Sequence, residues 1–311
     1  MMQDKKNIRL LISLITLVTV TVLFYWLANA DGRLEIDKTI FRVEDPTKIN
    51  TVTLESPKGK IELHYDGSGW KVNNRFDADR QLITVLFATL AQAEPKRSVS
   101  ENERPMIVDR VTKEGVKVSL LEEGELKKTF YSGGNIEKTL TYFYTQDGWP
   151  YVMTIPGYRI YVGSILELDE NGWRDKRVFS FNWRNFKKLT VSFLADAKED
   201  FEVSQRSRIF DIEGMTSDTT RLNNFLDDVS LLTGDSFISP ATFPKYDSLL
   251  SSSPTMKIVI SDIANRNYEL ELFQGIPGDP NVVGRVNGAD VMIFDRKKLF
   301  RIAKKGSYFK K

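Results

Sequence analysis

The residue types that most often carry catalysis or bind metal ions are scarce in this chain of 311 residues. It contains one histidine and no cysteine, which excludes disulfides, thiolate metal sites and cysteine nucleophiles. The histidine, His64, shares one face of an alternating strand pattern with Glu62 and Asp66, and apolar residues occupy the other face. We therefore expect His64 to face solvent, without the pocket and the nucleophile that a general base requires.

Carboxylate residues give no catalytic or metal-binding pattern either. Three acidic pairs are adjacent in the sequence, so their side chains diverge on a strand or a helix: Glu122-Glu123, Glu199-Asp200 and Asp227-Asp228. The turn Asp169–Gly172 has glycine at its fourth position, whereas a calcium-binding loop needs it at the sixth. We predict no catalytic residue, no cofactor and no metal ion. A hydrolase whose carboxylates come from separate strands would leave no local signature, and it is the enzymatic alternative.

Aromatic residues are the other group that could bind a ligand. Five of them gather in one part of the chain: Tyr142, Tyr144, Trp149, Tyr151 and Tyr158. Tyr142 and Tyr144 flank Phe143, so they share the opposite face of a predicted strand. An exposed aromatic face could stack on sugar rings or receive a partner protein. The alternative is that these rings pack between sheet layers or between the two halves of the chain.

The N-terminal residues predict a membrane anchor. Basic residues at positions 5, 6 and 9 precede the uncharged stretch Leu10–Ala30. As a helix this stretch would be about 31 Å long, the thickness of a bilayer's hydrocarbon core. The basic flank predicts a cytoplasmic N-terminus, with the bulk of the chain beyond the bacterial inner membrane, in the periplasm. A cleaved secretory signal ending at Ala28-Asn29-Ala30 is the alternative.

Three hydroxyl residues recur at a spacing of three within this stretch and share one face of the predicted helix: Ser13, Thr16 and Thr19. They could contact another membrane helix through interhelical hydrogen bonds. The alternative is that each hydroxyl donates to a carbonyl of its own helix.

The remainder of the chain is predicted to be one α+β unit used twice. Trp70–Val72 aligns with Phe210–Ile212, and Val116–Leu120 aligns with Met256–Ile260, each about 140 residues later. Each copy has strand patterns on both sides of one helical stripe, and the two stripes also align at this offset. The first stripe comprises Leu82, Val85, Leu86, Thr89 and Leu90; the second comprises Leu222, Phe225, Leu226 and Val229.

The predicted fold is therefore α+β, with an N-terminal transmembrane helix followed by two tandem strand-rich repeats of about 140 residues. The predicted parts are a cytoplasmic N-terminus (1–9), a transmembrane helix (10–30), a juxtamembrane linker (31–44), a first repeat (45–177) and a second repeat with a basic tail (178–311).

A charged segment with apolar flanks lies where the two repeats meet. It comprises Trp173, Arg174, Asp175, Lys176 and Arg177, and the strand-like run Val178–Phe181 follows it. These charges could form a docking patch. Alternatively, Arg174 and Asp175 make local ion pairs that fix the angle between the copies, while Trp173 and Phe179 are buried.

The element order, the duplication, the single anchor and this segment together resemble a bacterial family, domain of unknown function 4340 (DUF4340), over roughly residues 45–305. The resemblance implies a membrane-tethered envelope protein without an established activity. Members of the family often occur beside components of ABC-type export systems related to gliding motility. The resemblance thus implies an accessory role in transport.

The expected function is that of a non-enzymatic, membrane-anchored envelope protein, structural or accessory, with envelope or transporter proteins as partners. The net charge is only +2, from 44 basic and 42 acidic residues, which argues against nucleic acid as a partner. The alternative is an extracytoplasmic module that binds glycan, peptide or lipid through the aromatic residues between positions 142 and 158.

Overall fold

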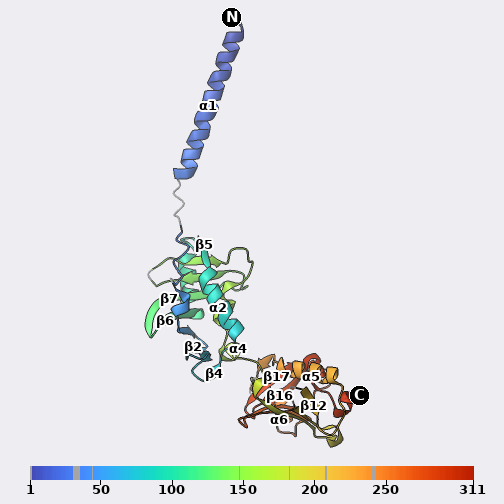
Figure 1. Ribbon diagram of the computed structural model, residues 1–311. Coiled ribbons are helices and arrows are strands. Elements are labelled where there is room, and N and C mark those ends of the chain that lie inside the picture. Colours follow the sequence, from blue (N-terminus) through green and yellow to red (C-terminus); the bar gives the residue numbers. More distant parts are fainter. Residues whose placement is uncertain are drawn as a thin grey trace. The chain divides into compact units, whose positions relative to one another are not determined.

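The computed structural model describes residues 2–30, 36–43, 45–146, 148–181, 183–206, 209–239 and 243–311. Residues 31–35 and 44 of the predicted linker (31–44) therefore lie outside the described residues. The chain forms two compact units (Figure 1): the first comprises Met1–Ser68 and Gln81–Glu167, and the second comprises Gly69–Arg80 and Leu168–Lys311. Each unit contains a mainly antiparallel sheet with helices, so the predicted α+β class is confirmed.

Helix α1 (Met2–Ala30) contains the whole predicted anchor, and every residue from Leu10 to Trp26 is exposed. Within the described part of the chain, no helix combines the length and the apolar character needed to cross a membrane, so the anchor stays a prediction from the sequence. The hydroxyls of Thr16 and Thr19 donate to carbonyls four residues earlier, at 2.9 and 2.8 Å. These two hydroxyls therefore make the bonds within their own helix that the alternative interpretation expects.

The sheet of the first unit has the strand order β2-β1-β6-β7-β8-β9-β5, with antiparallel neighbours. Two helices belong to it, α2 (Arg80–Gln92) and α3 (Arg104–Glu114), followed by the 3-10 helix η2 (Val162–Glu167). The strands are β1 (Thr51–Ser56), β2 (Gly59–Tyr65), β5 (Glu94–Ser98), β6 (Val116–Glu122), β7 (Glu125–Gly134), β8 (Thr141–Tyr144) and β9 (Tyr151–Thr154).

Helix α2 presents a different face to the core from the one predicted. Ile83, Leu86 and Leu90 are buried, together with Thr89, whereas Val85 is 47% exposed. On a helix with 100° per residue, Val85 lies about 200° around the axis from Ile83. The placement of Val85 in the buried stripe was therefore wrong, because the helix turns Ile83 inward instead.

The sheet of the second unit has the strand order β12-β11-β10-β14-β15-β16-β17-β13. Its helices are α4 (Glu170–Trp173), α5 (Thr219–Ser230), α6 (Asp247–Leu250) and α7 (Arg296–Ile302). The strands are β10 (Phe186–Phe193), β11 (Phe201–Arg206), β12 (Ile209–Ile212), β13 (Ser236–Phe237), β14 (Met256–Asp262), β15 (Asn267–Leu272), β16 (Asn281–Val286) and β17 (Asp290–Asp295).

Helix α5 follows directly from its sequence. Asp218 accepts hydrogen bonds from the backbone N–H groups of Thr220 and Arg221 and so caps the first turn. The predicted stripe Leu222, Phe225, Leu226 and Val229 is fully buried, in one apolar core with the strands β10, β11 and β14. The amphipathic pattern of this helix therefore predicted its buried face correctly.

One buried residue in each sheet has corresponding partners on the two neighbouring strands. Val52 in β1 pairs with Leu63 and Leu120 on its two sides. Leu189 in β10 pairs with Val203 and Ile260 in the same way. All six side chains are completely buried. Three neighbouring strands of each sheet are therefore arranged alike, in the order β2-β1-β6 and β11-β10-β14.

The segment Gly69–Arg80 belongs to the second unit although first-unit residues flank it on both sides. It contains the antiparallel strands β3 (Trp70–Val72) and β4 (Phe76–Asp77). The turn between them has Asn73 and Asn74 at φ 51° and 54°, the left-handed region that asparagine tolerates better than most residues. The boundary predicted at residues 177 and 178 did not anticipate this exchange of a segment.

Candidate functional site

Arg174 is held in the second unit by two aromatic rings and one carboxylate. Its guanidinium carbon lies 3.7 Å from the ring centroid of Phe76 in β4 and 3.7 Å from that of Phe237 in β13. Its Nη2 lies 2.7 Å from Oδ2 of Asp290 in β17, and the side chain is only 9% exposed. A planar guanidinium can stack on both faces while its edge pairs with a carboxylate, which lysine cannot do.

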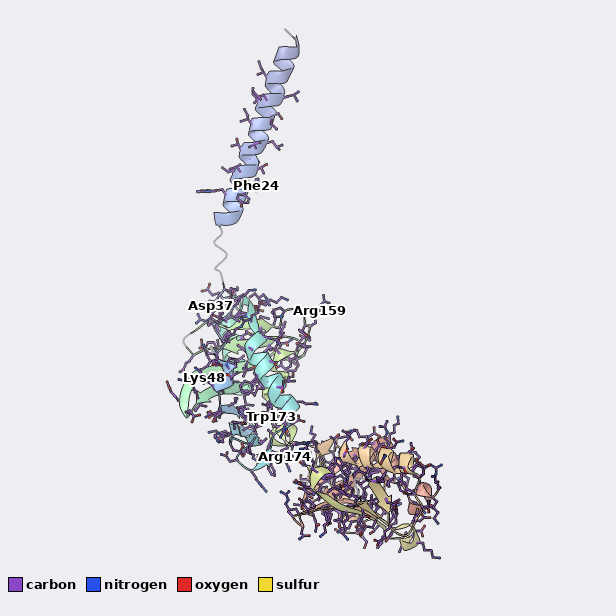
Figure 2. All side chains as sticks on the ribbon, in the orientation of Figure 1. Phe24, Asp37, Lys48, Arg159, Trp173 and Arg174 are labelled. Atoms are coloured by element: carbon purple, nitrogen blue, oxygen red, sulfur yellow. The ribbon has the colours of Figure 1, made fainter. Side chains whose placement is uncertain are left out.

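The backbone around Arg174 joins the same parts of the second unit. Asp175 N donates to Asp77 O at 2.8 Å, and Asp79 N donates to Trp173 O at 2.8 Å. The side chain of Trp173, labelled beside Arg174 in Figure 2, is completely buried. We call Arg174 with Phe76, Phe237 and Asp290 the arginine clamp, and it fastens Gly69–Arg80 to the rest of the second unit.

The remaining residues of the predicted junction are also bound locally. Nε of Arg177 donates to Oδ2 of Asp175 at 2.8 Å, and this ion pair raises the pKa of Arg177. The carbonyl of Lys176 accepts from Gly234 N at 2.9 Å, and Phe179 is buried. Arg174 is buried and Arg177 is paired with Asp175, so these two side chains do not form a free basic patch. The ion pair of Arg174 is made with the distant Asp290 and not within the segment.

Two of the five predicted surface aromatics are inside the first unit. Tyr142 and Tyr144 are only 7% and 9% exposed, in a cluster with Ile107 and Val111 of α3. The hydroxyl of Tyr144 donates to Gln146 O at 2.8 Å, and burial raises the pKa of Tyr142. For these two residues the alternative interpretation, packing inside the protein, is the one that fits, because α3 covers that face of β8.

The other three aromatics lie in three different settings. Nε1 of Trp149 donates to Val99 O at 2.8 Å, and the guanidinium carbon of Arg104 lies 4.2 Å from its ring centroid. Tyr151 packs edge-on against Phe41, with ring centroids 6.0 Å apart. Tyr158 is 62% exposed. The five residues therefore do not form one surface.

His64, the single histidine of the chain, makes a contact between two strands. Nδ1 of His64 lies 3.0 Å from the hydroxyl of Thr51, its partner across the β1–β2 pair. Among the residues that the structure describes, no three histidine or acidic side chains are grouped as metal ligands would be. The Thr51 hydroxyl is thus the neighbour that the structure shows for His64, in a contact across two paired strands.

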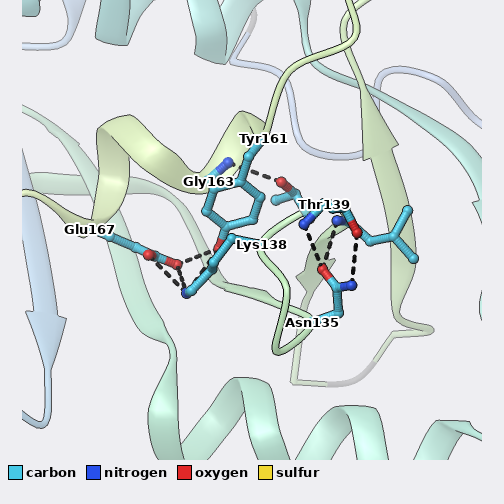
Figure 3. A network of polar contacts seen from close by, with 8 residues as sticks. Asn135, Lys138, Thr139, Tyr161, Gly163 and Glu167 are labelled. Carbon is cyan, nitrogen blue, oxygen red and sulfur yellow. Dashed lines mark hydrogen bonds and ion pairs between the residues drawn. The ribbon is translucent and has the colours of Figure 1, made fainter.

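A polar network in the first unit fastens the β7–β8 loop to η2 (Figure 3). Nζ of Lys138 lies 2.7 and 2.8 Å from the two carboxylate oxygens of Glu167, and the hydroxyl of Tyr161 donates to the same carboxylate. Oδ1 of Asn135 accepts from the backbone N–H groups of Thr139 and Leu140 at 2.8 and 2.7 Å, which shapes the loop.

The phenol of Tyr161 in this network is held in its protonated form. Burial first, and the neighbouring Glu167 second, raise the pKa of Tyr161, so its phenol stays protonated and cannot act as a base at neutral pH. The ring also packs tightly on the backbone, because a Cβ added to Gly134 would lie 2.4 Å from the Tyr161 hydroxyl. We therefore interpret Lys138, Tyr161 and Glu167 as a structural latch.

A groove of about 810 Å³ lies in the second unit and is a candidate binding site. Trp183 and Phe210 line it with ring centroids 5.4 Å apart. Polar side chains of α5 line it as well, among them Asn223 and Asp227. The sequence alone does not indicate that Trp183 lies beside Phe210, because their proximity depends on the pairing of β10, β11 and β12.

The family model described as domain of unknown function (DUF4340) matches residues 70–249. The chain belongs to this family. The DUF4340 match begins at the first residue of β3 and includes all residues that line the groove. It also includes the arginine clamp except for Asp290. No curated protein and no solved structure matches the chain.

Proposed function

We propose that this DUF4340 protein is a non-enzymatic protein tethered to the bacterial inner membrane, with residues 1–9 in the cytoplasm and both units in the periplasm. The observation that carries the proposal is the composition of α1. Leu10–Ala30 has no charged residue, and nothing in the described protein covers its side chains from Leu10 to Trp26. An uncharged helix whose side chains nothing covers is more stable in hydrocarbon than in water.

The tether can be tested by extraction of membranes from cells that express the full chain. The wild-type chain should stay with the membrane in alkaline carbonate. Val18→Asp should release much of it, because an aspartate near the centre of the bilayer is costly by about 3 kcal/mol. Val18→Leu is the matched control and should stay bound. Release of the wild-type chain, or a mature N-terminus at Asp31, would overturn the proposal.

We propose further that the two sheets are tandem repeats, residues 45–177 and 178–311, of about 140 residues each. The shared order of three neighbouring strands and the matching partners of Val52 and Leu189 support a duplication. A repeated scaffold without a preserved polar site is typical of a structural or interaction role, because function resides in sites and not in folds.

The role that fits this architecture is an accessory subunit of an envelope complex, such as an ABC-type export system related to gliding motility. The groove of the second unit supplies a place for an apolar side chain of a partner protein. Its aromatic walls and its polar α5 rim have the composition of an interface hot spot, where a buried anchor is surrounded by polar contacts.

A photo-crosslinking amino acid at position 223, on the rim of the groove, tests the partner in living cells. We expect a covalent adduct with one membrane or periplasmic protein, and we expect Trp183→Ala to reduce it. The same amino acid in place of Leu126, which is exposed in the first unit, is the control. Equal labelling from both positions, or recovery of the uncrosslinked chain alone, would contradict the proposed role.

A binding module for glycan, peptide or lipid is the second candidate. The groove favours it more than the residues 142–158 do, because Trp183 and Phe210 combine ring surfaces with nearby amide and carboxylate groups. Tryptophan fluorescence of the wild-type chain should then respond to a muropeptide or phospholipid extract, and Trp183→Phe should abolish the response. An unchanged response in Trp183→Phe would place the ligand elsewhere.

A further inference from the structure

Exposed apolar residues gather on two loops at one end of the first unit. Ile136 in the β7–β8 loop is 81% exposed, and Tyr158 and Ile160 after β9 are 62% and 56% exposed. All residues from Pro156 to Ile160 are exposed, Arg159 among them. We call Ile136, Tyr158, Arg159 and Ile160 the loop surface. One exposed apolar residue needs no explanation, but a group of three around an arginine indicates a contact.

The sheet brings the two loops together. Thr141 in β8 and Met153 in β9 are antiparallel partners, so the loop before β8 and the loop after β9 leave the sheet at the same end. The latch of Figure 3 joins them directly, since Nζ of Lys138 lies 3.3 Å from the hydroxyl of Tyr161. The loop surface is thus built on fixed backbone, which lowers the entropic cost of binding through it.

The segment that follows α1 contacts the first unit next to the same loops. Nζ of Lys38 lies 3.0 Å from Oε1 of Glu94, and Nη2 of Arg42 lies 3.6 Å from Oε2. Glu94 is the sheet partner of Thr154, the last residue of β9. Figure 2 shows Asp37 and Arg159 at the same end of the unit.

The length of chain between this point and α1 is short. Asp37 follows Ala30, the last residue of α1, by seven residues, which span at most about 25 Å when fully extended. If α1 crosses a bilayer, the end of the unit that holds Lys38 and Glu94 is the part nearest to that bilayer.

We propose that the loop surface rests on the lipid bilayer that holds α1. This inference rests on the proposed membrane tether and adds a second contact to it. Tyrosine and arginine are suited to the headgroup region, and isoleucine side chains can enter the boundary of the acyl chains. Arg159 makes no ion pair within the described part of the chain, so its charge is available to anionic lipid headgroups.

The absence of cysteine allows a direct test with the full chain. Ile160→Cys carries an environment-sensitive NBD label, and the chain is reconstituted in phosphatidylethanolamine–phosphatidylglycerol vesicles with nitroxide-labelled lipid. The matched control is Leu126→Cys, which is 54% exposed near the start of β7, at the opposite end of this strand from the β7–β8 loop. The nitroxide should quench position 160 at least about twofold more strongly than position 126.

Equal quenching at positions 160 and 126 would overturn the inference. A signal at position 160 that vanishes at one chain per vesicle would also overturn it, because the occupant would then be a second copy of the chain. Label on Val18→Cys tests the tether by itself. Strong quenching at position 18 without quenching at position 160 removes only the loop contact, whereas no quenching at position 18 removes the proposed tether.

Discussion

Two corresponding positions on paired strands are occupied by tyrosines in the first unit and by an ion pair in the second unit. Tyr131 in β7 pairs with Tyr144 in β8, with ring centroids 6.2 Å apart. Glu271 in β15 pairs with Arg285 in β16, and their charged groups lie 3.1 Å apart. The surroundings differ accordingly. The eleven-residue helix α3 covers the tyrosines, whereas Arg285 donates to Leu250 O at the end of the four-residue α6.

The next position along β8 and β16 also differs, in the size of its side chain. Phe143 in β8 is buried between Phe41 and Phe130. Gly284 in β16 stands in its place, and Phe294 of the next strand supplies the bulk, because a Cβ on Gly284 would lie 2.9 Å from its ring. Corresponding strands of the two sheets are therefore stabilised by different combinations of side chains.

The largest effect that would test this comparison is expected at Phe143. Phe143→Ala should lower the free energy of unfolding of the first unit by about 3–5 kcal/mol, because it leaves a cavity between two other rings. Hydrogen exchange of peptides from β6 to β9 during urea titration measures the change separately from the second unit. Val85→Ala, at an exposed site, should stay within about 0.5 kcal/mol. A loss at Phe143 below about 1 kcal/mol would mean that Phe41 and Phe130 fill the space.

A smaller effect is expected at Gly284. Gly284→Ala should destabilise the second unit by about 1–3 kcal/mol through overpacking against Phe294 and the backbone oxygen of Glu271, which would lie 3.0 Å from the new Cβ. Adding Phe294→Leu should recover part of this loss, and a double-mutant cycle measures the coupling. Strict additivity of the two changes would show that Phe294 does not occupy the space that Phe143 fills in the first unit.

The smallest effect concerns pH, because ion pairs replace apolar contacts beside α6. Asp279 accepts from Lys245 at 2.7 Å, from the Tyr246 hydroxyl at 3.0 Å and from Asn281 N at 2.9 Å. These bonds, that of Lys245 foremost, lower the pKa of Asp279 to about 2. A lowered carboxyl pKa stabilises the fold above its ordinary value near 4, and this contribution is lost as the pH falls toward 2.

Thermal unfolding at several pH values checks this expectation. The melting temperature of the second unit should fall between about pH 4 and pH 2, and it should fall less in Asp279→Asn, which has no carboxylate to protonate. The first unit, where α3 packs through Ile107 and Val111, serves as the internal reference. An equal acid response of the variant and the wild-type chain would remove Asp279 as its cause.

The features that could be predicted from the sequence are local ones. The cap and stripe of α5 and the strand alternation around Leu63 and Leu120 follow from residues close together in the chain. The burial of Tyr142 could not be predicted in this way. A strand pattern identifies which residues share a face, but not that α3 returns to cover it.

The candidate sites depend on contacts that no local pattern contains. The partners of Arg174 come from β4, β13 and β17, far apart in the sequence. Burying a cation between two rings contradicts the usual expectation that arginine is exposed. The groove was missed for the same reason, since Trp183 and Phe210 meet only after three strands have paired.

The assignment of Gly69–Arg80 to the second unit has a consequence for synthesis on the ribosome. Phe76 is made long before Phe237 and Asp290, its neighbours in the arginine clamp. The contacts of Phe76 in the arginine clamp can therefore form only after the rest of the first unit, through Glu167, has been translated and can already fold. A gene fragment that starts at Leu168 would encode the second unit without this hairpin. Arg174 would then lack its contact with the ring of Phe76 and keep the one with Phe237. No single cut in the chain separates the two units intact.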